Sequence, residues 1–265
     1  MIENKKPVII TIVLLVLVIL GLSGYIIYDK LLVNKIDDEP TKVTIGDVEI
    51  RPEAFYQIYN TLTKLDRAFN YEDSNFFGYI YKDKKIEVDK FDKQAALYAT
   101  LRNDMIATTE PRVIPEPVVK SKFEEMYGDN LKYEAKVIDA ADNYSILYNQ
   151  DSGYSYVSKD IINAYTSGIV SINAKTAVEN GTIIVTRKVF YVEYTPNEVG
   201  VVTTATIYND ISKQQKLGNV SIVKKGLNIE EILGKFSSKL STYNFIFREN
   251  SSNNNYALYR IERTR

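Results

Sequence analysis

The spacing of hydrophobic residues predicts three helices between residues 52 and 128. Pro52 suits a first helical turn, and the residues after it form one stripe at helical spacing: Phe55, Ile58, Tyr59, Leu62, Leu65 and Phe69. Asp92 is a good N-cap for a second helix, whose predicted buried face is Ala95, Tyr98, Leu101 and Met105. A third helix follows Pro117 and ends at Gly128, with a face formed by Val119, Phe123, Met126 and Tyr127.

After residue 131 the hydrophobic period changes to two, which is typical of strands. Alternation or β-branched runs predict strands over 144–148, 154–156, 168–178, 182–195 and 201–208, and a final hairpin from YNFIFR and YALYRIER. Between two of these strands, Asn180-Gly181 has the composition of a tight hairpin turn. Asn228, with Glu231 three residues later, predicts the start of one late helix. The order of elements therefore predicts an α+β fold, with helices packed on one face of a mostly antiparallel, curved sheet.

Residues 8–28 (VIITIVLLVLVILGLSGYIIY) predict a transmembrane helix. They contain no charge and are long enough to cross a hydrocarbon core of about 30 Å. A cleaved signal peptide is the alternative, but the apolar run continues beyond the small residues Gly21 and Ser23 and is too long for a usual signal. We therefore expect an uncleaved anchor.

The anchor divides the chain into a short tail and a large domain. Residues 1–7 are the expected cytoplasmic tail, 29–44 a polar tether, and 45–265 an extracytoplasmic α+β domain. The basic residues before and after the helix nearly balance, so the orientation rests on the very short N-terminal tail and on the absence of a basic excess at Asp37, Asp38 and Glu39. The opposite orientation, with the large domain in the cytoplasm, stays open as an alternative. A division of the large domain near residue 130, where the hydrophobic period changes, stays open as an alternative.

Composition removes many kinds of chemistry. The 265 residues include no cysteine, histidine or tryptophan, so thiol nucleophiles, imidazole bases and their metal sites are excluded. Thirty-three basic residues oppose 34 acidic ones, giving a net charge of −1, and this balance does not favour nucleic acid. No cofactor and no metal are predicted. The 21 tyrosines are expected mainly in cross-strand packing, with a recognition surface as the functional alternative.

Three local motifs carry little functional weight. NQDSG at 149–153 lacks the glycine and glutamate spacing of a calcium loop and is expected to be a turn. Ser221 and Lys224 match the S-x-x-K pattern of serine acyl enzymes, but their surroundings favour a strand, in which residues three apart point to opposite faces. The carboxylate pairs are expected on solvated surfaces: Asp37-Asp38, Glu124-Glu125 and Glu230-Glu231.

Two charged residues lie inside otherwise hydrophobic strand sequence. Glu193 stands between Val192 and Tyr194, and Lys188 is close to Phe190. General acid–base catalysis without histidine needs a carboxylate or lysine whose pKa is shifted by burial. These two residues are therefore the main candidates for such a group, although we expect both to point to solvent from a half-buried strand. No catalytic, cofactor-binding or metal-binding residue is assigned.

Several segments resemble uncharacterised single-pass membrane-anchored proteins of low-GC Gram-positive bacteria. These are GYIIYDK (24–30), KFEEMYGDNLKYEAK (122–136) and the C-terminal STYNFIFREN and YALYRIER. The resemblance implies a cell-surface location and an N-terminal anchor, and it transfers no activity. The expected function is a non-catalytic protein that binds an envelope protein or a cell-wall component. Two alternatives stay open: an anchored hydrolase using carboxylates, and a sensor ectodomain with a membrane partner.

Overall fold

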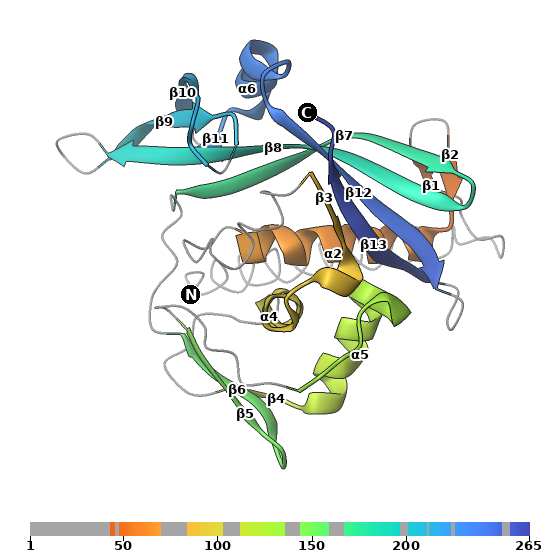
Figure 1. Cartoon of the computed structure of the whole chain (residues 1–265). Coiled ribbons are helices and arrows are strands. Elements are labelled where there is room, and N and C mark those ends of the chain that lie inside the picture. Colours follow the sequence, from red (N-terminus) through yellow and green to blue (C-terminus); the bar gives the residue numbers. More distant parts are fainter. Residues whose placement is uncertain are drawn as a thin grey trace, which may run out of the picture. The chain divides into compact units, whose positions relative to one another are not determined.

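The computed structural model describes residues 43–45, 48–69, 84–102, 112–135, 144–158, 167–196, 201–210, 212–223, 226–250 and 255–265 (Figure 1). Thr44–Arg265 form one structural unit. The predicted membrane helix at 8–28 lies outside the described residues, as do residues 1–7 and 29–42. Among the helices in the described part of the chain, none is long and apolar enough to cross a membrane.

Four α-helices and thirteen strands are distributed along the described ranges. The helices are α2 (Pro52–Phe69), α4 (Lys93–Arg102), α5 (Glu116–Tyr127) and α6 (Ile229–Phe236). The strands are β1 (Val43–Ile45), β2 (Val48–Ile50), β3 (Lys85–Glu87), β4 (Arg112–Ile114), β5 (Tyr144–Asn149), β6 (Gly153–Ser158), β7 (Gly168–Glu179), β8 (Thr182–Pro196), β9 (Val202–Tyr208), β10 (Lys216–Val223), β11 (Gly226–Leu227), β12 (Ser241–Asn250) and β13 (Asn255–Arg263). Every strand pair with a described register is antiparallel.

The large sheet divides along its central strand, β8. Strand β7 pairs with one edge of β8 from Thr182 to Val192. On the other edge, β12 pairs with the first part of β8, as far as Val189, and β9 pairs with the rest from Tyr191. One branch therefore continues through β12, β13 and β3, and the other through β9, β10 and β11. Both branches diverge from β8 in Figure 1.

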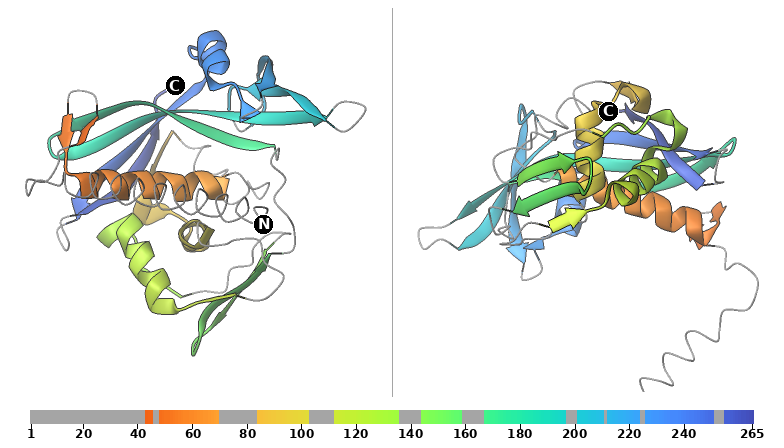
Figure 2. Two further views of the ribbon diagram at one scale, coloured as in Figure 1. Left: turned by 180° about the vertical axis from the view of Figure 1, so that it is seen from behind. Right: turned by 90° about the horizontal axis from the view of Figure 1, so that it is seen from below.

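The two faces of β8 carry separate hydrophobic cores. Odd-numbered side chains such as Val185 and Val189 join the larger core, which contains the buried residues of α2, α4 and α5. Even-numbered Phe190 and Val192 join a second core with Ile232 and others of α6. We call these surfaces the α2 face and the α6 face of the sheet. Figure 2 shows α2 and α6 on opposite sides of β8.

The predicted α+β class with a mostly antiparallel sheet is confirmed, but the helices do not all cover one face. Helix α6 is amphipathic and packs on the side opposite to α2, because β8 buries both Val189 and Phe190, which are neighbours and point in opposite directions. In the sequence of β8, buried hydrophobic residues fall at odd positions in the first half and at even positions in the second half. For that reason the sequence pattern did not indicate that each half of β8 is covered by a different helix.

The predicted helices are present, and the predicted buried faces of α4 and α5 are confirmed at the described residues. The Asp92 side chain accepts a hydrogen bond from the amide of Ala95 and caps α4 as expected, while Met105 lies outside the described residues. Asn228 caps α6 through the amide of Glu231. In α2 the predicted stripe is wrong at Tyr59, which is 54% exposed. The predicted positions Ile58, Leu62 and Leu65 are buried, and they are joined by Ala54, Gln57, Thr61 and Lys64.

Hairpin turns follow the predicted chemistry. Asn180 and Gly181 both have positive φ, 50° and 73°, as a two-residue hairpin of this composition requires. At the β5–β6 turn, Asn149 Oδ1 accepts the amide of Asp151, so NQDSG forms a side-chain-supported turn, as predicted. Strand β6 pairs with β4 on one side and with β5 on the other in a separate three-stranded sheet.

Candidate functional site

Glu193 lies in a small polar and aromatic cluster on the α2 face, beyond the area that the helices cover. Its carboxylate accepts a hydrogen bond of 2.9 Å from the hydroxyl of Tyr208. On its other oxygen, the Nζ atom of Lys213 is 3.5 Å away. The same Nζ lies 4.2 Å from the ring centroid of Tyr191. Four side chains therefore form a connected group, which we call the Glu193 cluster.

Strand register explains why these residues meet. Tyr191 pairs with Tyr208 across the β8–β9 ladder, and Glu193 pairs with Thr206. Directly paired residues point to the same face, so both tyrosines and the carboxylate project from one side. Their rings meet edge to face at 6.3 Å. Lys213 comes from the β9–β10 connection, where its backbone has a φ of 55°, an uncommon conformation for a residue with a side chain.

The cluster remains accessible to solvent. The Glu193 side chain is 42% exposed and that of Lys213 is 41% exposed. Around them the same face of β9 and β10 carries exposed polar side chains, including Thr204 and Asn219. The α2 face of this branch therefore offers aromatic edges, both signs of charge and neutral hydrogen-bonding groups.

The electrostatics of the cluster favour fixed protonation states. The hydrogen bond to Glu193 raises the pKa of the Tyr208 hydroxyl above its ordinary value. Burial acts to lower the pKa of Lys213, but Tyr191 and Glu193 outweigh it, and the resulting pKa is raised. At neutral pH the phenol keeps its proton and the lysine keeps its charge. Both raised pKa values lie further from pH 7, the range in which a general acid or base would act.

Lys188, the second sequence candidate, does not approach Glu193. Its position has the opposite parity in β8, so it projects from the α6 face, where Nζ donates a hydrogen bond of 2.9 Å to Thr242 Oγ1. The two strand charges are therefore on opposite sides of the sheet and do not form a joint acid–base pair. The expectation that they point outward from a half-buried strand fits their intermediate burial.

A buried ion pair that the sequence did not indicate joins α2 to the sheet. Arg187 donates to both carboxylate oxygens of Asp66, at 2.8 and 2.6 Å, and to the carbonyl of Ser171 at 3.3 Å. Its side chain is 4% exposed and lies 5.3 Å from the Phe245 ring centroid. Burial raises the pKa of Asp66, and Arg187 opposes that shift. Because the two charged groups bind each other, we interpret this pair as a structural link between α2 and the sheet.

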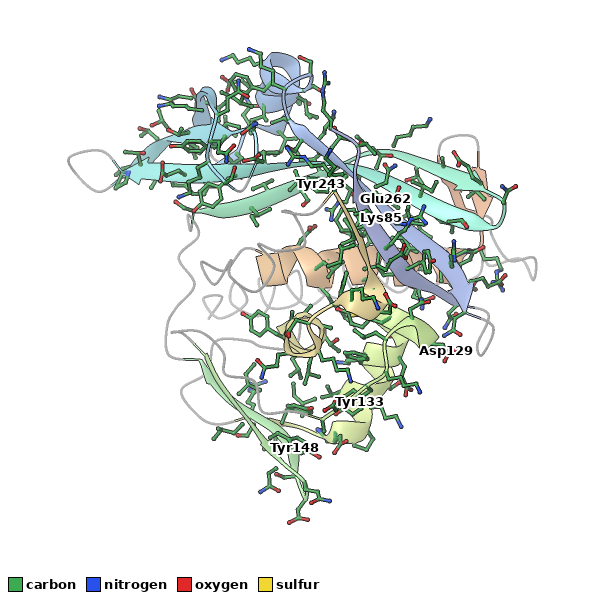
Figure 3. All side chains as sticks on the ribbon, in the orientation of Figure 1. Lys85, Asp129, Tyr133, Tyr148, Tyr243 and Glu262 are labelled. Carbon is green, nitrogen blue, oxygen red and sulfur yellow. The ribbon has the colours of Figure 1, made fainter. Side chains whose placement is uncertain are left out.

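A second group of tyrosines connects α5 to the three-stranded sheet. The hydroxyls of Tyr133 and Tyr154 are 3.1 Å apart, and Tyr148 donates to Glu116 at the start of α5. Figure 3 shows Tyr133 and Tyr148 in this region. The hydrogen bond to Glu116 raises the pKa of Tyr148 to about 12, and burial raises that of Tyr133 further still. Fully buried Tyr154 supports a packing role here.

The remaining sequence motifs do not assemble into a site. Ser221 lies in β10, in the strand that its surroundings predict, and Lys224 is outside the described residues. Glu230 and Glu231 lie in the first turn of α6, where Glu231 pairs with Lys235. Within the described residues, no three acidic side chains are grouped so that they could hold a metal ion.

Comparison of the chain with protein-family models, curated proteins and solved structures gives no match. The Glu193 cluster is therefore interpreted from its geometry alone. Residue parity could have placed Tyr191 beside Glu193. Sequence gives no register between β8 and β9, and so it did not identify Tyr208 or Lys213 as the partners.

Proposed function

We propose that the chain is a membrane-anchored, extracytoplasmic binding protein of the cell envelope, and that the Glu193 cluster contributes to recognition of an envelope protein or a wall component. The observation that carries the proposal is the exposed arrangement of Tyr208, Glu193 and Lys213 on a sheet face. Tyrosine combines apolar area with a hydroxyl and is enriched in recognition surfaces. The mutual hydrogen bond and ion pair hold these groups in place before a partner arrives, which reduces the entropy lost on binding.

The hydrophobic segment at 8–28 supports the membrane part of the proposal through its length and lack of charge. An anchor of this kind keeps a binding domain at the surface without further chemistry. The alternative of a carboxylate hydrolase would use Glu193 as an acid or nucleophile. In the structure its oxygens are instead occupied by Tyr208 and Lys213.

The test is retention of the purified full chain by envelopes isolated from cells that express it. The variant Glu193→Gln/Tyr208→Phe/Lys213→Gln removes the polar groups of the cluster. A control, Glu230→Gln/Tyr59→Phe/Lys239→Gln, makes the same changes at exposed positions elsewhere. We expect the first variant to lose at least tenfold in retention while the control behaves like wild type.

Equal retention of wild type and the cluster variant, or no retention of wild type, would contradict the proposal. Melting of both variants is measured alongside. Tyr208→Phe alone, which removes one hydroxyl, keeps the test decisive if the triple variant unfolds. Cleavage of an envelope polymer by wild type but not by Glu193→Gln would favour the hydrolase instead.

A further inference from the structure

The α6 face of the sheet continues alongside β12, on the opposite side from the Glu193 cluster. Helix α6 packs on the later part of β8, around Phe190 and Val192. Before this point the even-numbered side chains of β8 continue along the same face. The strand registers place the cross-strand partners of these side chains on the same face. On β12 the partners are Arg248 for Thr182, Asn244 for Thr186 and Thr242 for Lys188. On β7 the partner of Thr186 is Lys175.

Three basic side chains follow the direction of β8 on this face, and we call them the cation track: Arg248, Lys175 and Lys188. Arg248 lies beside Thr182 and Lys175 beside Thr186, four positions further along β8. At about 3.3 Å per residue, successive cations are roughly 13 and 7 Å apart along the strand. A bulge in β7 between Asn173 and Lys175 brings Lys175 to this face.

The track differs from the charges at its side. On β13 and β3, Arg260 pairs with Glu262 at 2.6 Å and Lys85 with Glu87 at 2.7 Å, so these charges are already neutralised. Figure 3 labels Lys85 and Glu262, which are cross-strand partners at this edge.

In the described part of the chain, no member of the track has an ion-pair partner. Lys188 bonds to the neutral Thr242, and Arg248 stacks 3.4 Å from the Tyr259 centroid. Glu179, paired with Thr182, is the acidic residue closest in register to Arg248. Among the described strand residues of β3, β7, β8, β12 and β13 on this face, five are basic and three are acidic: Arg248, Lys175, Lys188, Arg260 and Lys85 against Glu262, Glu87 and Glu179. The excess is positive although the whole chain has a net charge of −1.

We propose that the cation track binds a linear polymer that carries phosphate groups. One compact anion cannot touch three cations spread over about 20 Å of strand, whereas a chain with repeated anionic groups can. Arginine and lysine are the usual partners of phosphate oxygens. Between them, Thr186 and Asn244 already share a hydrogen bond of 2.8 Å and add neutral polar groups to the surface. This site is separate from the Glu193 cluster, and its binding chemistry does not depend on the proposed function.

The test uses the full chain in neutral detergent with sodium polyphosphate as the probe. We expect saturable binding. The logarithm of the association constant should fall linearly with the logarithm of the salt concentration, with a slope of about −2 for three phosphate contacts on a flexible single-chain polymer. The variant Lys175→Gln/Lys188→Gln/Arg248→Gln should bind at least tenfold more weakly. The control Lys90→Gln/Lys120→Gln/Lys132→Gln removes three exposed charges elsewhere and should bind like wild type.

Three results would overturn the proposal: no saturable binding by wild type at low salt, equal weakening in the control, or equal affinity for poly-L-glutamate, which would remove the preference for phosphate. If the triple variant fails to fold, Lys175→Gln alone is decisive because its side chain is exposed. It should weaken binding about two- to threefold. Unchanged affinity of the Lys175→Gln variant for polyphosphate would also contradict the proposal.

Discussion

At the scale of single residues, Arg187 and Asp66 determine how α2 is held against the sheet. Removing one member of a buried pair leaves the other without compensation. The effect should be unequal, because the Arg187 side chain is 4% exposed whereas that of Asp66 is 30% exposed and retains some water. Asp66→Leu should therefore cost about 3–5 kcal/mol in unfolding free energy, and Arg187→Leu about 2–4 kcal/mol.

The double variant separates the pair from its surroundings. Asp66→Leu/Arg187→Leu should cost clearly less than the sum of the single changes, since no buried charge is left unpaired. Urea denaturation followed by circular dichroism gives all three values. Additive costs would show that the two side chains contribute independently, contrary to their bidentate geometry.

Tyr148 gives a pH dependence with a defined direction. Its hydrogen bond to Glu116 raises its pKa to about 12 in the folded protein, against about 10 in an unfolded chain. A raised folded pKa means that the contribution is complete below about pH 10 and is lost as pH rises toward 12. The difference in melting temperature between wild type and Tyr148→Phe should therefore be constant up to about pH 9 and shrink to near zero by about pH 12. A difference that is the same at both ends would show that this hydrogen bond does not act as described.

Local chemistry was the part of the molecule that the sequence predicted best. The Asp92 and Asn228 caps and the Asn180-Gly181 turn depend on residues a few positions apart, and all were confirmed. The Glu193 cluster and the Arg187–Asp66 pair depend on residues from separate elements. Asp66 and Arg187 are 121 positions apart, and no short-range pattern encodes such a meeting.

At the scale of elements, the contact between α6 and β10 depends on Gly218. A Cβ atom at this position would come 2.9 Å from Cζ of Phe236, and the backbone φ is 154°. Gly218→Ala should destabilise the protein by about 1–3 kcal/mol, because the buried Phe236 ring would have to move.

Gly234 provides the matched control. It lies inside α6, and an added Cβ would meet nothing within 4 Å. Gly234→Ala should stabilise the protein by about 0.5–1 kcal/mol through helix propensity. Thermal melting of both variants distinguishes a specific contact from a general tolerance of glycine replacement. Equal behaviour of the two variants would contradict the described packing of α6.

Element types followed from periodicity, but burial on each face did not. Tyr59 is hydrophobic and correctly spaced for the α2 stripe, yet it is exposed and its ring stacks on Phe55 of the same helix. Short strands such as β3 were missed because three residues are too few to show alternation. Their positions are set by pairing with distant strands.

At the scale of the whole molecule, two cores share one strand, and each face of the sheet carries polar side chains beside its core. The α2 face beside β9 carries the Glu193 cluster, and the α6 face beside β12 carries the cation track. The sequence predicted the α+β class from the order of its elements. It did not predict the division of the sheet at β8, because strand order is a long-range property.

We propose that residues 8–28 hold the domain on the outer side of a membrane, and thiol labelling tests this arrangement directly. The chain has no cysteine, so a single Ser238→Cys change at an exposed position gives one reactive group. Asn4→Cys in the predicted tail is the paired control. In intact cells, a membrane-impermeant maleimide should label the Ser238→Cys protein in the membrane fraction and should not label the Asn4→Cys protein. Labelling of the Ser238→Cys protein only after lysis, or its recovery away from the membranes, would contradict the account.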